Sequence, residues 1–204
     1  CDSAGVGASI ETANKAKIPV FTVDIASISK LGVVQSHIAS DNYMGGQKAG
    51  ELMGKALGDK GGKVAIISHP GVTSVIDRVN GFKKALEKYP NVKSIAEVPA
   101  WGQRAKAAAI AEDLLTQLPD LAGIFGINDD SALGALASVE SAGKAGKIVI
   151  VGYDATPEAR EAIKKGFIYG DTIQYPDKIG SIAVSTMANY FKGHGWRAGE
   201  PVAV

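Results

Sequence analysis

The chain has 204 residues, of which 46% are hydrophobic and 21% charged, with 22 basic and 21 acidic side chains. This near-neutral balance argues against nucleic acid or an anionic membrane surface as the main partner. No apolar run approaches the roughly 18 residues that would span a bilayer, so any membrane contact would be peripheral. The composition is that of an α/β protein with length for one or two cores.

Cys1 is the only cysteine, so the sequence offers no pair for an internal disulfide and the redox compartment stays open. A leading cysteine also suggests a lipid anchor on its thiol. The basic segment and apolar stretch of a signal peptide are not seen. We expect instead that the chain begins at Cys1 in the middle of a domain.

Short apolar runs alternate with segments whose apolar residues recur every three or four positions, which predicts strands alternating with helices. In chain order we expect a helix at 6–17, strands at 18–24 and 33–40, a helix at 44–57, a strand at 63–68, a helix at 74–88, a strand at 92–98, a helix at 103–118, a strand at 122–125, a helix in the next connection, a strand at 148–151, a helix at 157–165, a strand at 167–174, a helix at 177–191 and an irregular tail at 193–204.

This alternation predicts the fold class. Strands separated by helices of about 10–15 residues form βαβ units and a parallel sheet. Right-handed crossovers then give a doubly wound α/β sheet with helices on both faces. Because ligands of such sheets bind at the carboxyl ends of the strands, the stretch 123–157 is central: its two strands end at Asn128 and Asp154.

Polar side chains recur at the carboxyl ends of the other expected strands as well. Carboxylates, amides and guanidinium groups are planar and can each bind two neighbouring hydroxyls. An aromatic face can cover the apolar face of a sugar ring. The set therefore suits a small polyhydroxylated ligand, and it comprises Asp24, Ser40, His69, Trp101, Asn128, Asp154 and Gln174, with Arg78 early in its helix.

Each of these residues also has a purely structural interpretation. Asn128 or Asp129 could cap the following helix, Asp154 could be a turn residue, and Gln174 could be a surface residue. The recurrence at successive strand ends favours a binding site.

Signatures of enzymes, metal sites and phosphate sites do not occur in the sequence. There is no G-x-S-x-G elbow, no H-x-x-x-H, C-x-x-C or EF-hand spacing, and no phosphate-binding P-loop. We expect His37 and His194 to be core or surface residues. Asp129-Asp130 could bind a metal, but its place at a helix start favours N-capping. We therefore expect no catalysis, no metal and no cofactor.

Six stretches carry a family resemblance: they read DSAGVGASIETANKAKIPVFTVD, HIASDNYMGGQKAGE, SVIDRVNGF, FGINDDSALGALASVESAG, IVGYDATPEAREAIKKG and DTIQYPDKIGSIAVSTMANYFKG. In this order they resemble the type I periplasmic sugar-binding proteins of ABC importers, of the ribose-binding type. The resemblance implies two doubly wound lobes, joined by three crossover segments, that close over a monosaccharide or polyol. It also implies a periplasmic or extracytoplasmic location, an ABC transporter permease as partner, and a monomer when complete.

The resemblance implies a role for most of the candidate residues. Asp24 would end a strand of the first lobe and hydrogen-bond sugar hydroxyls, and Ser40 would lie at the cleft. The matches to sugar-binding positions of the second lobe are Arg78, Asn128 and Asp154, and Gln174 matches the residue at the second crossover.

Three positions depart from the ribose-binding pattern. Ile25 follows Asp24 where the pattern has an arginine, which leaves ribose itself open as the ligand. His69 stands where the pattern has an apolar residue. Gly102 occupies the position of the stacking aromatic, so the neighbouring Trp101 would reach a sugar ring from a shifted angle or not at all.

The resemblance also divides the chain. We expect the end of the N-terminal lobe plus the first crossover at 1–35, the C-terminal sugar-binding lobe at 36–170, the return segment of the N-terminal lobe at 171–198, and the start of the third crossover at 199–204. Members of the family carry further residues ahead of the position that matches Cys1. We therefore expect most of the N-terminal lobe to be missing and its remaining apolar faces to be exposed.

Two other functions are compatible with this fold. One is the effector-binding domain of a lactose-repressor-type transcription regulator, which would need a helix-turn-helix ahead of the first lobe. The other is an α/β enzyme acting on sugars, for which the sequence offers no plausible nucleophile or acid–base pair. A binding module is the function that the sequence favours.

Overall fold

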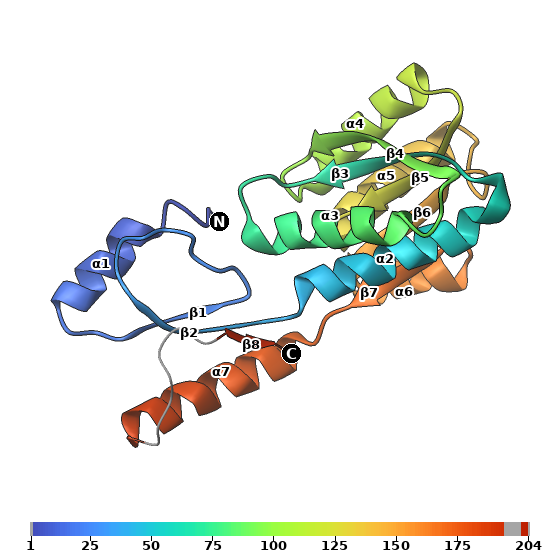
Figure 1. Ribbon diagram of the computed structural model, residues 1–204. Helices are drawn as coiled ribbons and strands as arrows, with labels where there is room; N and C mark the ends of the chain where they lie inside the picture. The colour runs from blue at the N-terminus through green and yellow to red at the C-terminus, as the bar shows by residue number, and fades with distance from the viewer. Residues whose placement is uncertain (1, 194–200, 204) are drawn as a thin grey trace. The chain divides into compact units, whose positions relative to one another are not determined.

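The computed structural model describes residues 2–193 and 201–203. The chain divides into two compact units, and each is described by itself (Figure 1). Unit 1 comprises Cys1–Asn42, Gly71–Ser74 and Tyr175–Val204, and unit 2 comprises Tyr43–Pro70 and Val75–Gln174. Within the described residues, no helix has the length and apolar character needed to cross a membrane.

Unit 2 is built on a five-stranded sheet with the strand order β4-β3-β5-β6-β7, and every neighbouring pair is parallel. The central strands are buried along almost their whole length, as expected for a parallel sheet covered on both faces. The strands are β3 (Gly62–Ser68), β4 (Val92–Pro99), β5 (Leu121–Gly126), β6 (Val149–Asp154) and β7 (Gly170–Ile173).

Helices cover both faces of this sheet, because parallel strands need a crossover connection that a helix provides. On one face, Ile67 and Ile124 pack with apolar residues of the helices α4, α5 and α6. On the other face, Phe82 of α3 stacks on Phe125 of β5 at 4.4 Å. The helices are α2 (Asn42–Leu57), α3 (Thr73–Leu86), α4 (Arg104–Gln117), α5 (Asp129–Ser141) and α6 (Pro157–Lys164), with the short helix η1 (Gly58–Lys60) after α2.

Unit 1 has a three-stranded parallel sheet in the order β1-β2-β8, made by β1 (Val20–Val23), β2 (Val34–Ala39) and β8 (Pro201–Ala203). It also holds the helices α1 (Gly7–Lys15) and α7 (Pro176–Phe191). Its core is small: Ile38 of β2 packs on Ile179 and Ala183 of α7.

The structure confirms an α/β fold with parallel sheets, and it corrects three predictions in unit 1. The helix expected at 6–17 is shorter, Gly7–Lys15. The strand expected at 18–24 is shorter, β1 at Val20–Val23, and it is half-buried to exposed because it is the edge strand of a small sheet. The tail expected to be irregular contains β8, which pairs with β2 through main-chain hydrogen bonds. No local sequence pattern predicts this pairing. His194 lies outside the described residues, and the lobe and crossover boundaries stay a prediction.

Candidate functional site

Five of the predicted site residues follow the five strands of unit 2 at their carboxyl ends. Because all these strands are parallel, their carboxyl ends meet at one edge of the sheet, which we call the carboxyl edge. In the order of the chain, the residues at this edge are His69 after β3, Trp101 after β4, Asn128 after β5, Asp154 at the end of β6 and Gln174 after β7.

Arg78, Asp154 and Gln174 form one polar network at this edge. The Gln174 side-chain amide donates to Asp154 Oδ1 at 2.7 Å. The Arg78 guanidinium lies 3.7 Å from the same oxygen and donates to the Ile127 carbonyl oxygen at 2.8 Å. The structure therefore brings Arg78 of α3 and Gln174, which follows β7, to the carboxylate of Asp154 at the end of β6.

Arg78 is only 5% exposed, and contacts with its side chain and its main chain fix its position. Its guanidinium carbon lies 3.8 Å from the centre of the Tyr153 ring, a cation–π contact. The α2 helix crosses close to the Arg78 main chain at Gly46, where an added Cβ would come within 2.1 Å of the Arg78 carbonyl oxygen. Gly46 permits the close crossing that holds Arg78 at the carboxyl edge.

Asp154 is held in an unusual environment and an unusual conformation. Burial raises the pKa of its carboxyl group, which outweighs the opposite effects of Arg78 and Gln174. Its φ angle is +113°, outside the regions that residues other than glycine normally adopt. Backbone strain of this kind persists where the surrounding structure enforces it, and it concentrates at functional sites.

Three of the predicted site residues share this backbone feature. Among the described residues other than glycine, positive φ angles occur at Lys17, Asp24, Trp101, Asp154 and Ala155. Strain therefore falls mainly on residues that the sequence had already selected for their chemistry. The backbone angles therefore support this selection by an observation that does not use side-chain chemistry.

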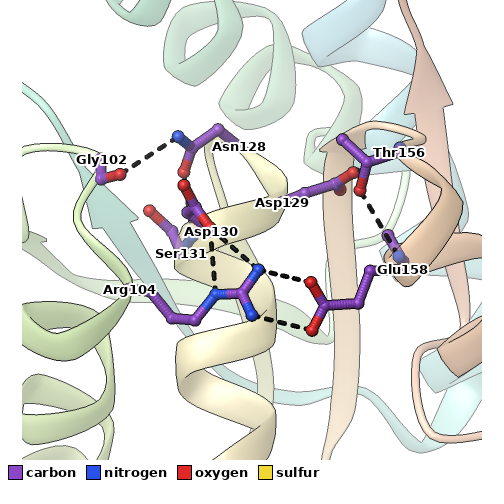
Figure 2. A network of polar contacts seen from close by, with 9 residues as sticks. Gly102, Arg104, Asn128, Asp129, Asp130, Ser131, Thr156 and Glu158 are labelled. Atoms are coloured by element: carbon purple, nitrogen blue, oxygen red, sulfur yellow. Dashed lines mark hydrogen bonds and ion pairs between the residues drawn. The ribbon is translucent and has the colours of Figure 1, made fainter.

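Asn128 has a structural role that the sequence analysis left open. Its side-chain oxygen accepts a hydrogen bond from the Ser131 amide at 2.9 Å and so caps α5. Its side-chain nitrogen lies 3.4 Å from the Gly102 carbonyl oxygen (Figure 2). The expectation that Asp129-Asp130 supplies the N-cap is wrong, because Asn128 takes that position.

The surroundings of Gly102 contain three other predicted residues. A Cβ at Gly102 would lie 3.2 Å from the Asn128 side-chain nitrogen and 3.7 Å from His69 Nδ1. The rings of His69 and Trp101 meet edge to face, with their centres 5.5 Å apart. The pKa of His69 is lowered by burial, so the ring is a neutral donor and acceptor at neutral pH.

A pocket of about 350 Å³ opens at the same edge, and Asn128 and Asp154 are among its lining residues. On its rim, Arg104 binds Glu158 through two hydrogen bonds of 2.8 Å and Asp130 through one of 3.0 Å. Figure 2 shows this guanidinium between the two carboxylates. The ion pairs join the starts of α4, α5 and α6. Arg104 was not predicted from the sequence, because its partners lie 26 and 54 residues away.

Asp24 and Ser40 belong to unit 1, so the structure does not group them with the residues of unit 2. Asp24 follows β1, has an exposed side chain, and donates its amide to the Ile38 carbonyl oxygen at 2.9 Å. Ser40 follows β2 and is half-buried. In β2, His37 contacts the Thr22 hydroxyl at 2.9 Å through Nδ1.

Asp129 and Asp171 are two further residues that the sequence analysis did not assign to the site. Asp129 begins α5 and is buried, and one of its oxygens accepts the Thr156 amide at 2.6 Å. Asp171 lies in β7, next to Gly152 of β6. A carboxylate inside a short strand was the available signal. Within residues 2–193 and 201–203, no group of three or more His, Cys, Asp or Glu is arranged to hold a metal ion.

The fold described above is that of a known family of binding proteins. The chain belongs to the periplasmic binding protein domain family, whose sequence model matches residues 1–195. It is 37% identical over 201 residues to the ribose import binding protein RbsB of Salmonella typhimurium, and the match covers 98% of this chain and 67% of that protein. It is 32% identical over 194 residues to the D-apiose import binding protein of Paraburkholderia graminis, covering 94% of this chain and 62% of that one.

Solved structures agree with these relatives. An ABC transporter periplasmic solute binding protein from Actinobacillus succinogenes with bound D-allose superposes with a TM-score of 0.90 and 31% identity, over 100% of this chain and 72% of that one. A solute binding protein from Agrobacterium vitis bound with α-D-tagatopyranose gives a TM-score of 0.88 and 30% identity, over 98% and 70%. The resemblance predicted from the sequence is confirmed, and the relatives are named as binding proteins, not as enzymes.

Proposed function

We propose that this chain is part of a periplasmic receptor that binds a monosaccharide or polyol and delivers it to an ABC transporter permease, without chemical change to the ligand. Unit 2 would supply the ligand groups at the carboxyl edge of its sheet. The observation that carries the proposal is the network of Arg78, Asp154 and Gln174, because it gathers a guanidinium, a carboxylate and an amide around one point.

These three groups match the chemistry of a neutral polyhydroxylated ligand. A carboxylate accepts from two hydroxyls, a guanidinium donates to two oxygens, and an amide does both. Burial strengthens such hydrogen bonds and makes an unpaired group costly. A ligand without hydroxyls would cover these polar groups without adding hydrogen bonds to them, so the edge selects for sugars and polyols over apolar molecules.

The surroundings of Gly102 bear on which sugar is bound. Gly102 has no side chain to fill the space in front of His69 and Asn128. Trp101 supplies an aromatic ring beside that space. We infer that this corner tolerates a substituent of the sugar ring that a large residue at position 102 would exclude. The names of relatives guide the choice of ligands to test: ribose, D-apiose and D-allose.

A titration of the pure chain with pentoses, hexoses and polyols, followed by calorimetry and thermal unfolding, tests the proposal. A ligand at 100 times its Kd adds about 2.7 kcal/mol to the stability of the protein that binds it. We expect one sugar or polyol to bind and to raise the Tm. A folded chain that binds none of them would contradict the proposal.

Substitutions at the network locate the site. Asp154→Ala and Arg78→Ala should each abolish most of the binding, because the remaining buried partners are left unpaired. Asp120→Asn is a matched control: Asp120 directly precedes β5 at the opposite edge of the sheet, where it pairs with Lys63 at 2.8 Å on the surface. Unchanged affinity in both site variants would remove these residues from the site.

A further inference from the structure

Two carboxyl groups from distant parts of the chain meet beneath the carboxyl edge of unit 2. Asp129 is the first residue of α5, and Asp171 lies in β7 beside Gly152 of β6. A Cβ built on Gly152 would lie 2.9 Å from Asp171 Oδ2 and 3.1 Å from Asp129 Oδ1. The two oxygens therefore face the same small space above Gly152, which only a residue without a side chain leaves open.

Among the residues that the structure describes, no donor reaches either oxygen. Asp129 is only 3% exposed, and its Oδ1 has no hydrogen-bond partner among the described residues. Both oxygens of Asp171 are also buried and have no hydrogen-bond partner in the described part of the chain. The other oxygen of Asp129 is satisfied, because Oδ2 accepts the Thr156 amide at 2.6 Å. Two ionised carboxylates buried around the same small space would repel each other, whereas a single proton between them supplies the missing donor.

The charges around the pair favour this arrangement. The acidic groups that act on Asp171 are Asp129 from α5 and Asp154 from β6, and both disfavour its ionisation. The guanidinium of Arg78 from α3 lies 3.7 Å from Asp154 Oδ1 and pairs with that carboxylate. Burial is the largest effect, and together with Asp129 it raises the pKa of Asp171 to about 9, although the main-chain amide of Thr172 acts in the opposite direction.

We propose that Asp171 is a positioning residue of the binding site: it keeps its proton and donates it to Asp129, which holds the Thr156 amide and with it the turn that carries Asp154. Asp171 touches no ligand in this arrangement. It acts through Asp129, whose second oxygen fixes the main chain two residues after Asp154. The inference rests on the proposed function, because Asp154 is the group whose position matters for the ligand.

The arrangement makes the stability of the chain depend on pH in a defined direction. The pKa of Asp171 is about 9 in the folded chain and near 3.8 in the unfolded chain. Between these values the folded state holds a proton that the unfolded state has released, so stability falls as the pH rises through this window. The stabilising contribution of the protonated pair is complete below the lower value and is lost as the pH passes about 9.

The test compares the wild type with Asp171→Asn and Asp171→Ala, and Asp113→Asn on the exposed side of α4 is the control. Asparagine keeps a donor toward Asp129 but cannot ionise. We expect Asp171→Asn to bind sugar as the wild type does at pH 7. At pH 10 the wild type should bind about tenfold more weakly, since only about a tenth of it retains the pair, while Asp171→Asn holds its affinity. Asp171→Ala should bind weakly at both values of pH.

A second readout does not depend on the ligand. The side-chain carboxyl ¹³C resonance of Asp171 should titrate with a midpoint near 9 in the ligand-free chain. A midpoint near 4, or equal pH profiles of unfolding for the wild type and Asp171→Asn, would overturn the acid pair. A high midpoint in a chain that binds no sugar would instead leave the acid pair standing and contradict the proposed function, so the two failures are distinguishable.

Discussion

Unit 1 and unit 2 are built from the same kind of parallel sheet, but they differ in the number of strands and in how completely the apolar side chains are buried. In unit 2, the five-stranded sheet has helices on both faces, and large side chains such as Ile124 and Phe125 are fully buried. In unit 1, the sheet has three strands, and large apolar side chains remain in solvent. Among them, Ile28 is 59% exposed, Val184 64% and Phe191 70%.

The difference in coverage bears on how stable each unit is by itself. A parallel sheet is stable when both faces are covered, and unit 2 meets this condition. Exposed apolar patches on a folded domain mark surfaces that another element or partner covers. The relatives that this chain matches are longer, since it spans 67% of the ribose import binding protein and 72% of the allose-bound structure. Unit 2 therefore carries the part of the proposed site that can be tested directly.

The largest expected effect compares the loss of stability when a buried isoleucine of unit 2 and an exposed isoleucine of unit 1 are each changed to alanine. Ile124→Ala in β5 should destabilise unit 2 by about 2–5 kcal/mol, because it leaves a cavity in a close-packed core. Ile28→Ala in unit 1 should change stability by less than about 0.5 kcal/mol, because the side chain is mostly in solvent. Urea unfolding of both variants measures the difference. Equal losses would show that unit 1 buries Ile28 as deeply as unit 2 buries Ile124.

A smaller effect separates the two roles of Asn128. Asn128→Ala should lose the cap of α5, at a cost of about 1 kcal/mol, and should also lose sugar binding. Asn128→Asp keeps an oxygen for the Ser131 amide, so stability should stay within a few tenths of a kcal/mol. Its affinity for sugar should still fall, because the amide donor is gone.

Thermal unfolding and calorimetry on the same samples distinguish these outcomes. If Asn128→Asp binds sugar as the wild type does, Asn128 is a cap and nothing more. In unit 1, α1 begins without a side-chain cap, so it offers no equivalent position.

The smallest effect concerns the ion pairs on the rim of the pocket. Arg104→Ala should cost less than about 1 kcal/mol, because Arg104, Asp130 and Glu158 are all partly in solvent. The loss should shrink as salt is added, since exposed charges are screened. Unfolding in low and high salt measures both. A loss that is large and insensitive to salt would mean that the network is buried.

The sequence was sufficient to predict the alternating architecture and the polar residues at the strand ends. These features are local: apolar runs define the strands, and the residue after each run lies at the carboxyl edge by topology. Asp154 and Gln174 were chosen in this way, and the Gln174 side-chain amide proves to donate to Asp154 Oδ1 at 2.7 Å. Their selection needed no knowledge of which strands are neighbours.

What the sequence could not provide depends on contacts between distant positions. Asp129 and Asp171 come together only because β6 lies between β5 and β7, and Gly152 faces Asp171 through the register of two strands. The pairing of β8 with β2 is of the same kind. In each case a local pattern was compatible with several partners, and only the sheet order selected one.

A ¹H–¹⁵N NMR titration of the chain with the sugar that binds most tightly in the screen tests most directly whether the carboxyl edge of unit 2 is the binding site. We expect the amide signals that move to belong to this edge, above all those of Gly102, Asn128, Asp154 and Gln174. This expectation concerns the position of the site. It is contradicted if these signals stay fixed while others move, for example those of the pocket between α4 and α5 that Glu112, Thr116 and Lys144 line.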